Sequence, residues 1–266
     1  MEKMMDGHPL FRQTVVNISP SASPIRRHEK MVWMGSCFVQ TMEPFLTRLR
    51  YSALVNPLGV VFHPSVMLRL LEMDEIEILA KSFESKSVCK NYWLAATFSG
   101  SKESVSNAIN LAVKQRDLHL NRASWLVLTL GTAFWYEHKE VGLVGKCHKQ
   151  PGNLFEKKRS EVGEIVIQFK QVIEYLRCSN PDLKVILTVS PVRHTRDGLA
   201  ENSVSKSILR LACQKLCDEV DRVFYFPAFE IVLDELRDYR FFGSDLVHPT
   251  GEAAAYIWSR FLNQFF

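Results

Sequence analysis

The sequence lacks any apolar run that approaches the ~20 residues a membrane-spanning helix needs, so we expect no membrane partner. The first stretch, MEKMMDGHPLFRQTVV, has neither a continuous apolar core nor a small-residue cleavage site. Both features are required of a secretory signal peptide. These absences predict a cytoplasmic protein.

A strong excess of charge of one sign is also missing. The formal net charge is only +4, and the basic residues are scattered along the chain. The nearest approach to a basic cluster is KKR at 157–159, which we interpret as a solvated turn. We therefore expect no nucleic-acid partner, since such proteins concentrate basic residues on one face.

Cysteine is present but is not arranged as a framework. The six cysteines show neither CxxC spacing nor dense clustering, which is typical of free, mostly buried thiols in a reducing cytoplasm. Glu137, His138, Cys147 and His148 could each ligate a metal, yet their spacing matches no zinc template. We expect no metal and no other cofactor.

No linker, internal repeat or low-complexity tract divides the 266 residues. The apolar fraction of 47% and the charged fraction of 23% are ordinary for a globular protein. We predict a single domain over 1–266, with a core of about 31–264 and an N-terminal extension at 1–30. The segments 74–102 and 136–160 are interpreted as insertions or lids on that domain.

Short apolar runs alternate with helical patterns. Several runs are continuously apolar, as expected of strands covered on both faces, and each ends at Gly, Ser, Asn or Pro. The five runs are MVWM (31–34), SALV (52–55), WLVLTL (125–130), KVILTV (184–189) and VFYF (223–226). The main helical patterns are at 65–73, 103–117, 160–177, 203–219 and 251–264. This alternation predicts βαβ units and a mainly parallel five-stranded sheet.

Ligands of such sheets bind at the carboxyl ends of the strands, where Gly35-Ser36-Cys37 follows the first run. Gly35 permits a tight turn, and a helix starting there would offer free N–H groups to a developing anion. Ser36 is then a candidate nucleophile, or simply a helix N-cap. Cys37 is the less favoured nucleophile, because alternation of side-chain direction would turn it away from the rim.

Asp245 and His248 stand three residues apart in a Gly- and Pro-bounded loop before the last helical pattern. At that spacing a local turn lets the carboxylate hold one imidazole nitrogen while the other faces outward. Such a pair could activate a serine. The alternative is an Asp that caps a turn and a His on a surface loop.

Four sequence blocks resemble those of the SGNH/GDSL hydrolases: GSCF (35–38), NPLG (56–59), LGT (130–132) and DLVH (245–248). Together with LTLGTAFWY, CHKQPGNLF, SPVRH and DELRDYRF, they more closely resemble the GSCFA-domain family, over about Val32 to Phe261. The resemblance implies a flavodoxin-like three-layer α/β/α sandwich with strand order 2-1-3-4-5.

The resemblance also implies roles for individual residues. Ser36 matches the nucleophile, His248 the general base and acid, and Asp245 the residue that orients His248. The Ser36 N–H and the second block, with Asn56 and Gly59, would bind the oxyanion or the substrate.

The third block departs from the SGNH pattern of Gly-x-Asn-Asp. Gly131-Thr132-Ala133-Phe134 stands there, and the Ala133 side chain cannot donate a hydrogen bond. We therefore expect compensation from Thr132 or from a cationic group at the rim. Candidates for that group or for substrate binding are His148, Lys149, Arg193 and His194, although an ion pair of Arg193 with Asp197 is the alternative.

These roles imply a serine esterase or acyl hydrolase that works through an acyl-enzyme without a cofactor. The expected substrate is a small-molecule or carbohydrate ester with an O-acyl group such as O-acetyl. Two alternatives stay open. An O-acyltransferase would use the same triad, and a catalytically weak ligand-binding module would explain Ala133.

Overall fold

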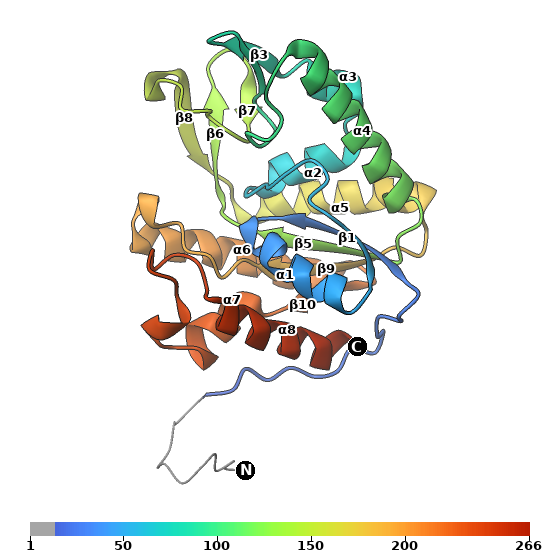
Figure 1. Cartoon of the computed structure of the whole chain (residues 1–266). Coiled ribbons are helices and arrows are strands. Elements are labelled where there is room, and N and C mark those ends of the chain that lie inside the picture. The colour runs from blue at the N-terminus through green and yellow to red at the C-terminus, as the bar shows by residue number, and fades with distance from the viewer. Residues whose placement is uncertain (1–13) are drawn as a thin grey trace.

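Five parallel strands form the central sheet of the computed structural model, which describes residues 14–266 (Figure 1). The strands are β1 (Lys30–Gly35), β2 (Ser52–Val55), β5 (Trp125–Leu130), β9 (Lys184–Val189) and β10 (Val223–Phe226). They pair in the order β2-β1-β5-β9-β10, and every pairing is parallel. Numbered along the chain this is 2-1-3-4-5, which confirms the predicted topology. Of the predicted extension at 1–30, residues 1–13 lie outside the described part.

Helices cover both faces of the sheet (Figure 1). One layer holds α1 (Cys37–Arg48), α7 (Ala228–Glu230) and α8 (Gly251–Phe265). The other holds α2 (Pro64–Glu72), α4 (Lys102–Leu120), α5 (Val162–Ser179) and α6 (Leu199–Glu219). Successive strand residues enter opposite cores, as Val127 and Leu128 do. Apolar side chains on both faces explain why the strand sequences are continuously apolar. The predicted three-layer α/β/α sandwich is confirmed.

The predicted insertions contain small antiparallel sheets. The first holds α3 (Glu75–Leu79) and a hairpin of β3 (Ser82–Ser85) and β4 (Val88–Asn91). The second contains a sheet of β6 (Phe134–His138), β7 (Gly142–Val144) and β8 (Phe155–Arg159), in the order β7-β6-β8. The interpretation of KKR at 157–159 as a turn is wrong, because these residues lie in β8, an edge strand where lysines discourage further pairing.

Short helical turns complete the chain. They are η1 (Gly152–Leu154), η2 (Thr195–Asp197), the π-helical η3 (Ile231–Glu235) and η4 (Tyr239–Phe241). The segment 14–29 runs along α8, where the Ser21 and Ile25 N–H groups donate to the carbonyls of Gln264 and Phe265.

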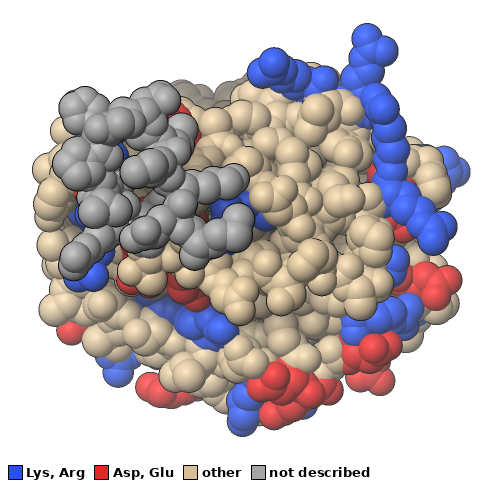
Figure 2. Space-filling model, turned by 90° about the horizontal axis from the view of Figure 1, so that it is seen from below, with Lys and Arg blue, Asp and Glu red and all other residues tan. Residues whose placement is uncertain are grey.

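On the face seen in Figure 2, Lys and Arg mix with Asp and Glu around a mainly uncharged centre. Within residues 14–266, no helix is both long enough and apolar enough to cross a bilayer.

Candidate active site

Gly35 ends β1 in a conformation that only glycine adopts readily. Its φ is 143°, and a Cβ at this position would lie 2.2 Å from the carbonyl oxygen of Thr129 on the neighbouring strand β5. The Ser36 N–H donates to that same oxygen at 3.2 Å. The chain therefore passes against β5 as it leaves the sheet, and α1 begins two residues later at the sheet rim.

The orientation expected for Ser36 and Cys37 is wrong. Ser36 is fully buried, and its Oγ accepts a hydrogen bond from the Phe38 N–H at 3.3 Å as the N-cap of α1. The partly exposed Cys37 thiol instead contacts His248, with 3.4 Å between Sγ and Nε2. Strand alternation does not apply here, because Ser36 ends the extended segment and Cys37 is the first helical residue.

Asp245 and His248 form the local turn that their spacing predicts. Asp245 Oδ1 accepts the N–H groups of Val247 and His248, and Oδ2 lies 2.7 Å from His248 Nδ1. The hydrogen bond from His248, followed by the two backbone donors, lowers the pKa of Asp245 to about 2. Asp245 is therefore ionised at neutral pH and can only accept, so Nδ1 carries the proton that it donates.

In the neutral imidazole this tautomer leaves the Nε2 lone pair facing the Cys37 thiol. Burial raises the pKa of Cys37, while its own N–H, the Phe38 N–H, Lys146 and Lys206 act in the opposite direction. The thiol therefore keeps its proton at rest, and His248 is placed to remove it. Cys37, His248 and Asp245 thus have the connectivity of a nucleophile, a base and an orienting carboxylate.

The N–H groups expected to bind an oxyanion are already engaged. Ser36 donates to Thr129, and Gly59 donates to the Asn56 carbonyl at 2.8 Å. Asn56 is buried and bends back, so that its Oδ1 accepts the Gly35 N–H at 2.8 Å. Its Nδ2 is buried without a hydrogen-bond partner among the described residues. The Asn56 amide is therefore the second-block group with a free donor beside the β1–α1 turn.

Thr132 is occupied in holding α6 against the end of β5. Its hydroxyl accepts the Phe134 N–H and lies 3.1 Å from the Ser205 hydroxyl, while its N–H donates to the Phe62 carbonyl. The next residue on α6, Lys206, extends to the same strand end. Its Nζ donates to the carbonyls of Gly131 at 2.6 Å and Ser190 at 2.7 Å. A lysine amino group therefore stands in the third block, where the sequence lacks the asparagine.

The sequence-based assignment missed both Lys206 and Lys146. Lys206 is 1% exposed, and burial lowers its pKa to about 7. It shares the inward face of α6 with Leu209 and Cys213, and a lysine in that apolar pattern is the signal that could have found it. Lys146 follows β7 and places Nζ 4.1 Å from the centre of the Phe62 ring; burial lowers its pKa to about 8.

Arg193 and His194 lie where β9 leaves the sheet. The Arg193 guanidinium lies 3.9 Å from the centre of the Phe242 ring. It forms no ion pair with Asp197, which pairs with Lys157 at 2.5 Å. His194 packs edge-on against Phe62, and burial lowers its pKa to about 4.

The other cationic candidates are part of the insertions. His148 Nε2 lies 2.7 Å from the Asn91 carbonyl, and its ring packs against Phe83. Lys149 is exposed. His148 is thus engaged by the first insertion. In the described part of the chain, no three His, Cys, Asp or Glu residues are grouped as a metal would require.

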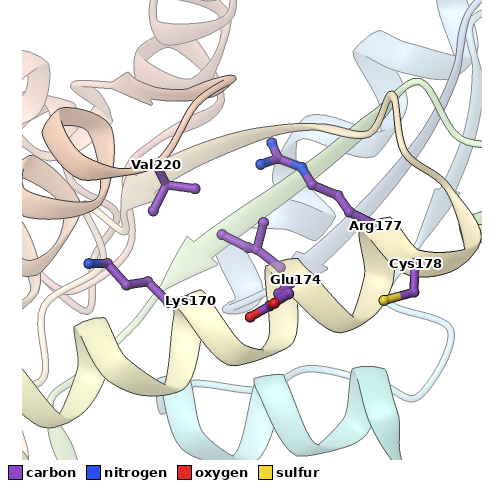
Figure 3. A pocket seen from close by; sticks show the side chains of 6 residues that line it. Lys170, Glu174, Arg177, Cys178 and Val220 are labelled. Atoms are coloured by element: carbon purple, nitrogen blue, oxygen red, sulfur yellow. The ribbon is translucent and has the colours of Figure 1, made fainter.

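Two hollows of about 350 and 360 Å³ lie outside this cluster. The first lies between α5 and the end of α6 and is lined by Lys170, Ile173, Glu174, Arg177, Cys178 and Val220 (Figure 3). The second lies between the two insertions and includes Tyr92 and His138. Neither is lined by Cys37 or His248, whose side chain is 52% exposed. Cys37, His248 and Asp245 therefore lie outside both of these hollows.

Solved structures with similar folds include three esterases or lipases. A carbohydrate esterase family 3 protein from Talaromyces cellulolyticus is 9% identical, over 88% of this chain and 94% of that one, with a TM-score of 0.42. A GDSL-like lipase from Bacteroides thetaiotaomicron is 13% identical, over 91% and 89%, with a TM-score of 0.40. A family two carbohydrate esterase from Clostridium thermocellum, in complex with cellohexaose, is 13% identical, over 91% and 65%, with a TM-score of 0.42.

A comparison with curated proteins finds no match. The model of the GSCFA family matches residues 30–261. This span runs from the first residue of β1 into the last turns of α8 and contains Cys37, Asp245 and His248. The chain belongs to the GSCFA family.

Proposed function

We propose that this protein is an acyl hydrolase in which Cys37 is the nucleophile, His248 the general base and acid, and Asp245 the residue that orients His248. One observation carries the proposal: Cys37 Sγ, His248 Nε2, His248 Nδ1 and Asp245 Oδ2 form a continuous chain with contacts of 3.4 and 2.7 Å. A working nucleophile and base need this contact, which is often looser before substrate binds. Ser36 lacks it, because its hydroxyl caps α1.

The proposed reaction has two steps. His248 Nε2 takes the thiol proton as Cys37 Sγ attacks the acyl carbon, and the oxyanion forms. The carbon–oxygen bond to the leaving group then breaks, and His248 returns the proton to the departing alcohol. Water attacks the resulting thioester with His248 again taking the proton, which releases the acid and regenerates the thiol. Asp245 stabilises the imidazolium in both steps.

Two donors suit the oxyanion of that reaction. The Cys37 N–H is at the first position of α1, where no carbonyl of the helix accepts it, and it lies beside its own sulfur. The Asn56 Nδ2 is the second candidate, because it is buried, unpartnered and part of the amide that binds Gly35. The positive end of the α1 dipole adds to both. Removing one such donor typically lowers the rate by about 10²–10³.

For the substrate, we propose an O-acyl ester, such as an O-acetyl ester, of a carbohydrate or small metabolite. The family resemblance supports this class. Water or a hydroxyl of a second substrate could intercept the thioester, so a transferase would use the same three residues. Hydrolysis is the simpler proposal, since the His248 and Asp245 side chains are about half exposed and water can reach the proposed base.

The experiment measures the turnover of an aryl acetate ester by the wild-type protein and by the Cys37→Ala and Ser36→Ala variants. We expect mass spectrometry to detect an acetylated peptide in the wild-type protein. Cys37→Ala should lose both turnover and this peptide. Ser36→Ala should keep both, although loss of the N-cap costs about 1 kcal/mol of stability. Neutral hydroxylamine should remove the acetyl group, because a thioester reacts with it and an oxygen ester does not. Turnover that survives in Cys37→Ala and vanishes in folded Ser36→Ala would assign the serine instead.

The same assay separates the alternatives. Turnover that rises with added alcohol or sugar, at a constant rate of acylation, indicates transfer. A folded protein that never becomes acylated is a binding module and contradicts the proposed hydrolase.

A further inference from the structure

Lys206 is a buried amino group that faces only neutral groups and carries a positive charge when it is protonated. Its side chain is packed on the buried face of α6. Nζ donates to the Gly131 and Ser190 carbonyls, and the centre of the Phe229 ring lies 5.9 Å away. No carboxylate of residues 14–266 lies within ion-pair distance of it. Carbonyl dipoles satisfy its donors but leave its charge uncancelled. The charge therefore acts on whatever occupies the ends of β5 and β9.

Lys146 is a second such cation, at the same rim but less deeply placed. The N–H groups of Gly145 and Lys146 both donate to the Tyr92 carbonyl, which fixes the backbone after β7. The half-buried side chain lies over Phe62, whose carbonyl accepts N–H groups from the end of β5. The described residues supply no carboxylate partner for Lys146 either. The Lys146 ammonium is therefore held in place, and its N–H groups remain available to a ligand.

The nearby acidic groups are committed elsewhere. Asp245 is bonded to His248, and Asp197 is paired with Lys157. Lys146 and Lys206 both lie close enough to Cys37 to favour its thiolate and so oppose the rise in its pKa. Asp245 keeps its negative charge on the far side of the His248 ring from Cys37, whereas Lys146 and Lys206 have no carboxylate partner among the described residues.

Unpartnered polar atoms lie at the same rim. His194 Nε2 and Asn56 Nδ2 are buried and have no hydrogen-bond partner among the described residues. The His194 ring packs on Phe62, the ring that also lies under Lys146. Buried polar atoms without partners are uncommon, and a bound ligand is one way to satisfy them.

We propose that the site takes acyl compounds that carry a negative charge near the acyl carbon, such as a carboxylate or a phosphate, and that Lys146 binds this charge. The substrate class rests on the proposed function; the anion site itself does not. Lys206 is too deeply buried to bind the anion directly and instead raises the local positive potential. Lys146 is only half buried and can reach a ligand beside Cys37.

Alkylation of Cys37 tests the anion site without requiring turnover. Iodoacetate and iodoacetamide both react when the thiolate sulfur attacks the methylene carbon and iodide leaves, but only iodoacetate is negatively charged. Their rate ratio at Cys37 therefore cancels the thiolate fraction and reports the local potential. We expect this ratio to exceed the ratio at a reference thiol by about five- to tenfold, the effect of one partly screened opposite charge.

Cys178 provides that reference within the same sample. It is exposed on α5 and lines the first hollow together with the charged residues Lys170, Glu174 and Arg177 (Figure 3). Lys146→Met should lower the Cys37 ratio most of the way toward that of Cys178. Lys146→Arg should keep it, because the charge remains. Lys139→Met is the matched control, since this exposed lysine lies in the turn between β6 and β7 and should leave the ratio unchanged.

A Cys37 ratio no higher than that of Cys178 in wild-type protein overturns the proposal. So does a high ratio that persists in folded Lys146→Met. If that variant does not fold, the wild-type excess must still disappear at high salt, which screens charges near the surface. Failure of the ester assay together with a high, Lys146-dependent ratio would reject the hydrolase and leave the anion site standing.

Discussion

Gly35→Ala should destabilise the protein far more than an ordinary glycine substitution. The added Cβ would lie 2.2 Å from the Thr129 carbonyl oxygen, so β1 or β5 must shift by about 1 Å to restore a normal van der Waals contact. A non-glycine residue at φ 143° also costs about 1–3 kcal/mol. Losing the Ser36 N–H bond to Thr129 costs about 1 kcal/mol more. These two terms predict a loss of about 2–4 kcal/mol, and the shift of the strands adds to it.

Equilibrium unfolding in urea measures this loss, and Gly142→Ala is the matched control. Gly142 also has a positive φ, 79°, but a Cβ there meets nothing within 4 Å. We therefore expect about 1 kcal/mol for the control, from the backbone conformation alone. Equal losses in the two variants would refute the close-contact argument. A folded Gly35→Ala protein should also show slower alkylation of Cys37, because the β1–α1 turn positions the thiol.

Three further predictions concern the ionisable groups. Asp245→Asn should lower kcat by about 10²–10⁴ with little change in melting temperature; equal kcat values would exclude the triad. The pKa of Lys206 is about 7 in the folded protein and 10.5 ordinarily, so the unfolded chain binds more protons between these pH values. In urea unfolding, the stability of the wild-type protein should therefore rise relative to that of Lys206→Met as the pH is raised from 7 to 10.5. A stability difference that does not change with pH refutes the lowered pKa. The pKa of Lys146 is about 8, so KM for an anionic ester should rise above pH 8; an unchanged KM contradicts the anion site.

The strands of the central sheet could be predicted from the sequence almost residue by residue. SALV, WLVLTL, KVILTV and VFYF coincide with β2, β5, β9 and β10. These segments are apolar on both faces and end in turn-forming residues, so local sequence carries the information. The strands of the insertions could not be found in this way. β8, for instance, reads FEKKR and is only partly buried, and its pairing with β6 depends on residues some twenty positions away.

The candidate site was predicted in part. The local turn of Asp245 and His248 needs only three residues of spacing, and the structure has it. The choice between Ser36 and Cys37 depends on where the strand stops and the helix starts, and a shift of one residue reverses it. Lys146 and Lys206 come from an insertion and from the middle of a helix. Only the tertiary fold brings them to the rim, so no local motif could have placed them beside the thiol.

A cysteine at the first helical position is consistent with the rest of the rim. A thiol is a better nucleophile than a hydroxyl, so it tolerates a weaker arrangement for binding the oxyanion. Here the third block supplies carbonyls and Lys206 in place of an amide donor. In the proposed reaction, burial keeps the Cys37 thiol protonated at rest, and His248 and the two lysines favour the thiolate when it attacks. If Cys37 is the nucleophile, as proposed, its greater nucleophilicity offsets the missing asparagine of the third block.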